Sequence, residues 1–262
     1  MIKWKLDYKP IDFHTHMGLE YCLYYPDHDA DGMVRAMDDC NVDFVVCAPC
    51  EDLFGGEKVG GLITDAMRRY PDRFKGYYCV NPVVGYDVSE IKKAFRENPG
   101  FVGLKFLPDY HRTALTDLVY APALELANEY HMLVLSHTWG VSMNGESCNS
   151  ADKVIGVLER YPNITFIMGH SIQGQVDDAI AIAKKYPNAY LDLCDTCRLN
   201  GVVEKMVREV GAKQVIFGTD APMQTHNFQM GCVIGAKITD EEKKLILRDN
   251  ALRILATVGR PE

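Results

Sequence analysis

Short apolar runs alternate with longer amphipathic runs along the whole chain. The apolar runs have the length of β-strands and occupy Pro10–His14, Asp43–Ala48, Phe74–Val80, Phe101–Leu107, Met132–His137, Ile164–Gly169, Ala189–Leu193 and Gln214–Gly218. The amphipathic runs have helical periodicity and occupy Asp31–Asp39, Val59–Tyr70, Val88–Glu97, Leu118–Tyr130, Ala151–Tyr161, Gln175–Tyr186, Gly201–Val210 and Asp240–Ala256. Strands that are mostly apolar on both faces, alternating with helices, predict an α/β fold of the (β/α)8 TIM-barrel type.

The same alternation runs through residues 1–262 without a linker, an internal repeat or a low-complexity segment. We therefore expect a single domain, because α/β barrels of this size are commonly one domain. An open, doubly wound sheet is the alternative. That fold would need a glycine-rich phosphate-binding turn after its first strand, and the sequence HTHMG at residues 14–18 does not supply one.

The amino-acid composition argues against nucleic-acid and membrane partners. The chain has 28 basic and 36 acidic residues, a formal net charge of −8, so it offers no basic field for binding nucleic acid. Its first ten residues contain no apolar core of signal-peptide length, and no later run approaches the ~18 apolar residues of a membrane span. We expect a cytoplasmic protein that acts on a small molecule, without nucleic-acid or membrane partners.

The nine cysteines are an odd number, and many of them lie in apolar runs. This pattern predicts buried, reduced thiols rather than a disulfide framework. Two CxxC spacings, Cys47/Cys50 and Cys194/Cys197, are an alternative four-thiolate zinc site. Each pair begins inside a strand-like run, however, and that run already explains its first cysteine as a core or barrel-lining residue.

Two histidines, His14 and His16, are one residue apart at the end of the first apolar run. Side chains alternate between the faces of a strand, so both histidines are expected to point the same way, together with Asp12. Two such imidazoles can bind a single cation through their ring nitrogens. The alternative is a polar strand end with two incidental histidines.

Further polar side chains accompany the later strands. They are Lys105 within the fourth strand, His137 at the end of the fifth, His170 after the sixth and Asp220 after the eighth. Active sites of these barrels form at the carboxyl ends of the strands. Taken singly, each residue has a structural explanation, as a core histidine, a helix cap or an ion pair. Together they would need a separate explanation for every strand, which favours one site.

Other histidines and arginines are weaker candidates for the functional site. His28, His111 and His226 are expected in loops, and His131 at the far end of the fifth strand, although His111 and His226 remain candidates for substrate contact. A further pair of loop residues, Arg112 and Arg198, are candidate carboxylate clamps, but an arginine on a loop is more often simply solvated.

The motifs resemble the amidohydrolase superfamily, specifically its amidohydrolase-related branch, often called amidohydrolase family 2. The likeness covers nearly the whole chain and is carried, in order, by IDFHTH, GLKFLPDY, VLSHTWG, YPNITFIMGHSIQG, AYLDLCD, VIFGTDAPM and ITDEEKKLILRDNALRIL. The resemblance implies that one divalent ion, usually zinc and alternatively manganese, is held by His14, His16, His137 and Asp220. It also implies that His170 is a catalytic or substrate-polarising group beside the ion.

The resemblance leaves the number of metal ions open. Some branches of the superfamily carry a carboxylated lysine at the position of Lys105, where it bridges two metals, and His137 and His170 then hold the second ion. This sequence contains the residues for either arrangement.

The resemblance implies hydrolysis of a small amide, ester or lactone by a metal-activated water, with Asp220 as the catalytic proton shuttle. The alternative is metal-dependent, non-oxidative decarboxylation of a small carboxylic acid. We expect hydrolysis, because decarboxylases of this family are usually longer chains. A non-catalytic small-molecule-binding barrel and a metal-independent lactonase are further alternatives.

Assembly is a separate expectation. Barrels of this family are often dimers or larger. The apolar residues Met223, Phe228 and Met230 follow the eighth strand and are expected to be exposed, so we expect a homo-oligomer.

Overall fold

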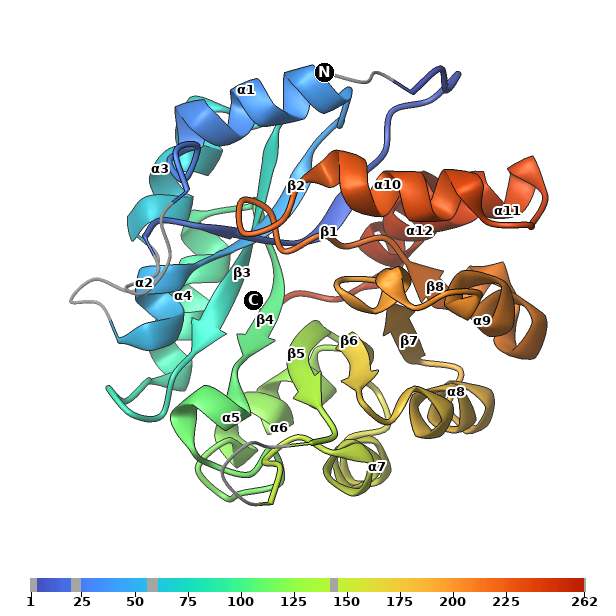
Figure 1. Cartoon of the computed structure of the whole chain (residues 1–262). Coiled ribbons are helices and arrows are strands. Elements are labelled where there is room, and N and C mark those ends of the chain that lie inside the picture. The colour runs from blue at the N-terminus through green and yellow to red at the C-terminus, as the bar shows by residue number, and fades with distance from the viewer. Residues whose placement is uncertain (1–3, 20–24, 56–60, 142–145, 262) are drawn as a thin grey trace.

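Eight parallel strands form one sheet in the order β1 to β8. The computed structural model describes residues 4–19, 25–55, 61–141 and 146–261. The strands are β1 (Asp12–Met17), β2 (Val45–Pro49), β3 (Phe74–Val80), β4 (Phe101–Phe106), β5 (Leu133–Trp139), β6 (Thr165–Gln173), β7 (Ala189–Asp192) and β8 (Val215–Ile216). Figure 1 shows them around the centre of the molecule with the helices outside. The predicted TIM barrel is confirmed.

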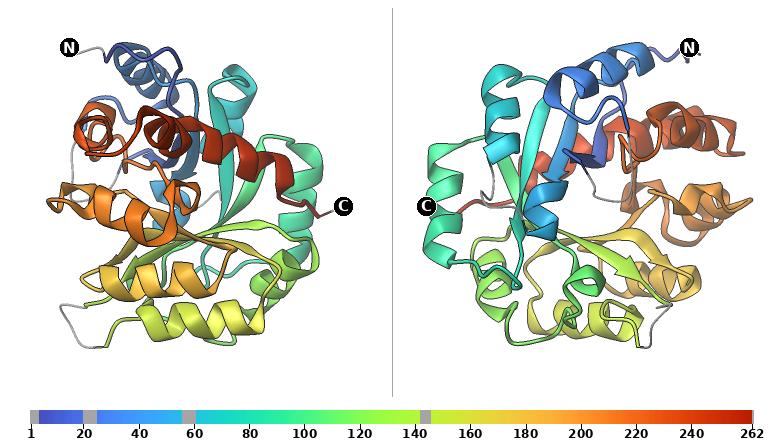
Figure 2. Two further views of the ribbon diagram at one scale, coloured as in Figure 1. Left: turned by 90° about the vertical axis from the view of Figure 1, so that its right-hand side faces the viewer. Right: turned by 60° about the vertical axis from the view of Figure 1, so that its left-hand side comes forward.

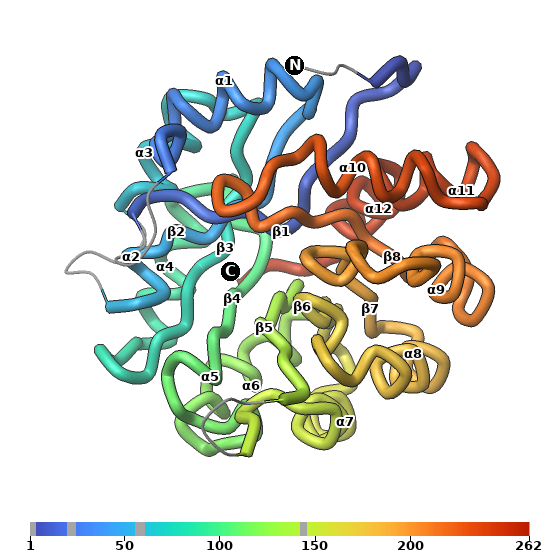
Figure 3. The backbone as a smooth tube through the Cα atoms, viewed as in Figure 1, coloured from blue at the N-terminus to red at the C-terminus, as the bar shows by residue number. Residues whose placement is uncertain are grey.

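The barrel closes between the two ends of the chain. Phe13 N donates to Phe217 O at 3.0 Å, and His16 N donates to Ala221 O at 2.7 Å, while Thr15 and Ala221 form an isolated parallel bridge. In Figure 3 the blue β1 accordingly lies beside the orange segment that follows β8. The regular part of β8 is only two residues long, so closure depends on individual hydrogen bonds from residues beyond it.

Helices surround the sheet. They are α1 (Ala30–Cys40), α2 (Cys50–Phe54), α3 (Gly61–Arg69), α4 (Val88–Glu97), α5 (Pro108–His111), α6 (Ala121–Glu129), α7 (Ala151–Arg160), α8 (Val176–Lys185), α9 (Val202–Val210), α10 (His226–Gly235), α11 (Asp240–Lys244) and α12 (Asn250–Thr257). The described residues also form two short 3₁₀ helices, η1 (Thr196–Arg198) and η2 (Ala212–Gln214), and a π-helix, η3 (Leu245–Asp249). No helix in the described ranges is long and apolar enough to cross a membrane.

Most predicted helices have counterparts within a few residues. The prediction Val59–Tyr70 matches α3, although its first two residues lie outside the described residues. The single helix predicted at Asp240–Ala256 is confirmed as a continuous helical segment, in which the π-helix η3 joins α11 to α12. Helices α2, α5 and α10 were not predicted, and two of them are only four or five residues long.

Two apolar layers explain why the strands are hydrophobic on both faces. One layer packs between sheet and helices and includes Leu104 and Phe106 of β4. The other fills the barrel interior. Residues Ala251 and Ile254 of α12 belong to this inner layer, and Figure 2 shows that last helix, in red, running across the barrel. Because Leu104 and Phe106 face the helices, Lys105 between them faces the interior.

The register of β1 is irregular at its polar end. Asp12 pairs with Val45 and Thr15 pairs with Cys47, so the register shifts between them. An extra residue in a strand alters the simple alternation of side chains. The expectation that Asp12 shares a face with His14 and His16 is therefore wrong: Asp12 contacts His226 and Thr219 instead.

Candidate metal centre

His14 of β1 lies at the centre of a buried polar cluster. Its Nδ1 is 2.7 Å from Asp192 Oδ2, and its Nε2 is 2.6 Å from Lys105 Nζ. A carboxylate only accepts and an ammonium only donates, so Nδ1 carries the proton and Nε2 is an acceptor. A carboxylate that fixes the tautomer in this way is the usual partner of a metal-binding histidine.

Asp220, from the segment after β8, faces both histidines of β1. Its Oδ1 lies 3.3 Å from His14 Nε2 and 3.2 Å from His16 Nε2. This buried oxygen has no hydrogen-bond partner among the described residues. Two donor atoms bound to one zinc ion at 2.0–2.1 Å in tetrahedral geometry are about 3.3 Å apart. The three side chains therefore fit a divalent ion.

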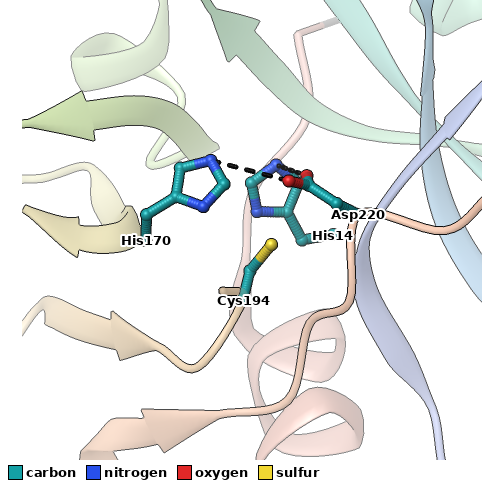
Figure 4. A group of neighbouring side chains, drawn as sticks. All are labelled: His14, His170, Cys194 and Asp220. Atoms are coloured by element: carbon teal, nitrogen blue, oxygen red, sulfur yellow. Dashed lines mark ion pairs between the residues drawn. The ribbon is translucent and has the colours of Figure 1, made fainter. Parts of the chain in front are cut away.

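A second set of donors overlaps the first. His14, His170, Cys194 and Asp220 each offer one donor atom, and these four atoms lie within 4.8 Å of one another. Figure 4 shows the four side chains pointing toward one another, with ion pairs from Asp220 to both histidines. His170 is 3% exposed, and its Nδ1 has no hydrogen-bond partner among the described residues. A buried polar atom without a partner is costly unless a ligand satisfies it.

The carboxylate of Asp192, at the end of β7, links three members of this cluster. Besides His14 Nδ1, its Oδ2 accepts from His170 N at 3.1 Å, and its Oδ1 accepts from Cys194 N at 3.1 Å. Asp192 is fully buried. One carboxylate therefore fixes the relative positions of β1, β6 and the β7 end.

The backbone at the end of β6 is strained. His170, Ser171 and Ile172 have φ angles of 63°, 47° and 49°, in the left-handed region, which costs non-glycine residues energy. Hydrogen bonds hold the turn: Ser171 Oγ donates to Asp192 O at 2.7 Å, and Ile172 N donates to Thr138 Oγ1 at 2.9 Å. The turn directs His170 into the cluster.

His137 of β5 contacts the donor group through the ring of His170. Its ring is edge-to-face with His170, at 4.6 Å between centroids, and stacked on Trp139 at 5.5 Å. It is outside the four-atom donor group described above. The structure therefore brings His14, His16 and Asp220 together, and the role of His137 as a ligand stays a prediction.

A pocket of about 210 Å³ opens above the cluster. Its walls include the aromatic residues Phe54, Tyr110 and Trp139. The lining is completed by His16, Leu53, Leu107, His137, His170, Asp195, Asp220, Met223 and Gln224. No lysine or arginine is among these described lining residues, so a negatively charged ligand would meet no lysine or arginine side chain in this wall.

Burial shapes the electrostatics of the cluster. Burial and the nearby Lys105 hold the pKa of His14 well below its ordinary value, and burial with the neighbouring His170 does the same to the pKa of His137. Neutral imidazole is the form that binds metals. Burial raises the pKa of Asp220, but His170, His14 and His16 outweigh it and hold that pKa well below the ordinary value. Asp220 is therefore a carboxylate at neutral pH.

Lys105 of β4 is fully buried beside His14. Burial lowers its pKa, and the Asp220 carboxylate partly offsets the effect. Its ammonium points into the barrel, 2.6 Å from His14 Nε2. Whether it takes part in a second metal site stays a prediction.

Other expectations need correction. His226 is not in a loop but is the first residue of α10, 2% exposed, with Nδ1 2.8 Å from Asp12 Oδ2. His111 is also not in a loop: it ends α5 and bonds to Tyr120 and Leu53. Neither histidine is among the residues that line the pocket.

The remaining candidates lie outside the site. Arg198 pairs with Asp195 at 3.0 Å rather than lining the pocket, and Arg112 is exposed at the end of α5. Of the cysteines in the two CxxC pairs, only Cys194 belongs to the donor group found among the described residues. Met230 is fully buried, so its expected exposure is wrong, whereas Phe228 is 49% exposed. Homo-oligomerisation stays a prediction.

Sequence reasoning missed Asp192, Asp195 and the aromatic wall. Asp192 could have been found from the sequence, because it is a carboxylate at the end of an apolar strand, the same kind of position that the other site residues occupy. Phe54 and Tyr110 had none, since they belong to the short helices α2 and α5 or their vicinity, whose positions depend on packing above the barrel rather than on a local pattern.

Comparison with known proteins identifies the family. The family model described as amidohydrolase matches residues 11–257. The chain belongs to amidohydrolase family 2. This result confirms the resemblance carried by the motifs and places the chain in a family of enzymes. No curated protein in the comparison matches the sequence.

Solved structures of similar fold include decarboxylases. An uncharacterized TIM-barrel protein from Bordetella bronchiseptica has a TM-score of 0.76 at 17% identity, over 95% of this chain and 99% of that one. A 5-carboxyvanillate decarboxylase from Novosphingobium aromaticivorans, complexed with manganese and 4-hydroxy-3-methoxy-5-nitrobenzoic acid, has 0.75 at 13%, over 95% and 96%. A dihydroxybenzoic acid decarboxylase from Polaromonas, with manganese and 2-nitroresorcinol, has 0.73 at 16%, over 95% and 97%. At these identities the likeness establishes the fold.

Proposed function

We propose that this amidohydrolase-family protein is a divalent-metal-dependent, non-oxidative decarboxylase of a small aromatic carboxylic acid. The observation that carries the proposal is the pocket, which places aromatic walls beside the donor cluster and has no lysine or arginine among the described residues that line it. A substrate carboxylate would therefore find its positive partner at the ion. The volume of about 210 Å³ lies below the ~300 Å³ at which pockets for drug-sized ligands begin.

The structural neighbours support decarboxylation over hydrolysis. Two of them are named as decarboxylases of aromatic acids and contain manganese. The matches extend over 96% and 97% of those chains, so the length of this chain no longer favours hydrolysis.

Each group has a role in this proposal. When bound, the divalent ion supplies Lewis-acid stabilisation to the carboxylate and a neighbouring oxygen of the substrate. Phe54, Tyr110 and Trp139 hold the ring. As the carbon–carbon bond breaks and carbon dioxide leaves, the ring carbon needs a proton, and we assign its delivery to Asp220, whose carboxylate takes that proton up from solvent and passes it on; Asp220 Oδ2 lies 4.0 Å from His170 Nε2. Asp220 is thereby a carboxylate again after each turnover.

Hydrolysis of a small amide, ester or lactone is the second candidate. The observation in its favour is the depressed pKa of Asp220, which keeps a carboxylate base beside His14 and His16 at neutral pH. A base of this kind suits removal of a proton from water.

Release of carbon dioxide tests the proposal. Protein loaded with manganese or zinc is incubated with 2,6-dihydroxybenzoate and 5-carboxyvanillate and, in parallel, with aryl esters and lactones. We expect metal-dependent carbon dioxide release, reduced by ~10²–10⁴ in Asp220→Asn, the usual contribution of a positioned acid–base group. The variant Lys184→Gln, which removes a surface ion pair with Glu209 between α8 and α9, is the control. Hydrolysis without carbon dioxide release would overturn the proposal in favour of the second candidate.

A further inference from the structure

Cys194 places a sulfur atom inside the donor cluster. It follows β7, is fully buried, and lies with His14, His170 and Asp220 in the group whose donor atoms are within 4.8 Å of one another. Figure 4 shows its side chain directed between His14, His170 and Asp220. Four donors bound to one ion have separations within this limit, because metal–nitrogen and metal–oxygen bonds are about 2.0–2.2 Å and metal–thiolate bonds about 2.3 Å.

The neighbouring side chains supply independent support for a ligand at this place. His170 Nδ1 is buried and has no hydrogen-bond partner in the described part of the chain, and the same is true of Asp220 Oδ1. Two buried polar atoms near the Cys194 sulfur therefore lack a hydrogen-bond partner within the ranges that the structure describes, which is energetically costly. A bound cation would remove this cost.

The backbone around Cys194 is held firmly. Asp192 Oδ1 accepts from Cys194 N, while Asp192 Oδ2 accepts from His14 Nδ1 and His170 N. One carboxylate thus sets the positions of three of the four donors. A metal site needs this kind of fixed support for its ligands.

We propose that Cys194 is a thiolate ligand of the divalent ion, in a donor set with His14, His170 and Asp220, and that its sulfur gives the site a preference for zinc over manganese. On binding, the Cys194 S–H bond breaks, a sulfur–metal bond forms, and the proton passes to solvent. Thiolate favours zinc, whereas oxygen donors suit manganese. The inference rests on the proposed function only in requiring that an ion binds.

Cobalt spectroscopy tests the ligand directly. Apo-protein is loaded with Co²⁺, and absorption is recorded in the near ultraviolet, where thiolate-to-cobalt charge transfer occurs, and in the visible, where the d–d bands report cobalt binding. We expect both signals in the unaltered protein. Cys194→Ser should lose the charge-transfer band and keep the d–d bands. Cys197→Ser is the matched control, because Cys197 is also buried but contacts Gln229 outside the donor group, and it should keep both.

A second measurement uses only the unaltered chain. X-ray absorption at the zinc edge should show one sulfur scatterer at about 2.3 Å. Competition between zinc and manganese should then show a preference for zinc that falls at least about tenfold in Cys194→Ser.

The outcomes are distinct. Bound cobalt without a charge-transfer band, bound zinc without a sulfur scatterer, or a band that persists in Cys194→Ser would each overturn the thiolate ligand while leaving the metal-dependent function standing. A protein that binds no divalent ion would overturn both. Metal binding with the sulfur signature but without carbon dioxide release would retain the ligand and reject the proposed reaction.

Discussion

Two buried histidine–aspartate pairs contact the first strand, and they resemble each other closely in geometry. His14 Nδ1 is 2.7 Å from Asp192 Oδ2, and His226 Nδ1 is 2.8 Å from Asp12 Oδ2. Both aspartates are fully buried and both histidines are at most 2% exposed. Distance and burial alone therefore do not distinguish a metal-binding pair from a structural one.

The difference lies in what surrounds each pair. The second nitrogen of His14 faces Lys105 and Asp220. The Asp12–His226 pair is instead bound to Thr219, whose Oγ1 donates to Asp12 Oδ2 at 2.5 Å. One pair thus orients a donor toward a cluster that fits an ion, while the other fastens α10 to β1. The same chemistry gives a ligand or a structural clamp according to its neighbours.

The largest expected difference between the pairs is in metal content. His14→Ala should reduce bound metal from about one ion per chain to near zero, because it removes one of the two donors, His14 and Asp220, that both sets share. His226→Ala should keep the metal but lower the free energy of unfolding by about 3 kcal/mol, since Asp12 loses its buried partner. Elemental analysis and denaturant titration measure the two effects. Loss of metal in both variants would show that the pairs are not functionally distinct.

The second largest difference is expected between the two aspartates, in the effect of each on metal affinity. Asp192→Asn removes the charge that orients His14 and should weaken metal binding ~10–100-fold, the usual effect of losing such a partner. Asp12→Asn should leave metal affinity unchanged. Metal titration of the two variants under identical buffer conditions compares them directly. Equal affinities would contradict the orienting role of Asp192.

Thr219 sharpens the comparison, because it lies beside Asp220 but bonds to Asp12. Thr219→Val should cost about 1–3 kcal/mol of unfolding free energy, the penalty for unsatisfied buried polar groups. Metal content should stay at the level of the unaltered protein. A drop in metal content would mean that the structural pair also controls the position of Asp220.

The smallest effect concerns His111, a buried histidine whose ring bonds to a phenol and a backbone carbonyl rather than to a carboxylate. Burial lowers the pKa of His111, which bonds to Tyr120 and Leu53. The unfolded chain therefore binds a proton more readily, and stability from this group is present above about pH 6.5 and lost as pH falls below it. His111→Gln should flatten this slope by at most about 1.4 kcal/mol per pH unit. Denaturant midpoints between pH 5 and 7.5 measure it, and identical slopes would reject the assignment.

The barrel was predictable from sequence because its strands are apolar on both faces and each is long enough to recognise. The positions of His14, His16, His170 and Asp220 followed from the convergence of parallel strand ends. Two features did not follow. The shift in register within β1 moved Asp12 away from the cluster, and the left-handed turn at His170 depends on distant partners such as Asp192. Both are set by tertiary contacts that no local pattern encodes.

Closure of the barrel by its two ends has a consequence for biogenesis. Thr219 and Asp12, which bond to each other, are 207 positions apart in the sequence, and Asp220 meets His14 and His16 only when this seam forms. Pairing of such remote segments is slow because a long loop must close first. During synthesis, the histidines of β1 emerge about two hundred residues before Asp220 does. A chain truncated before residue 220 would therefore lack one of the donors. Tight metal binding would distinguish chains synthesised beyond residue 220 from shorter ones.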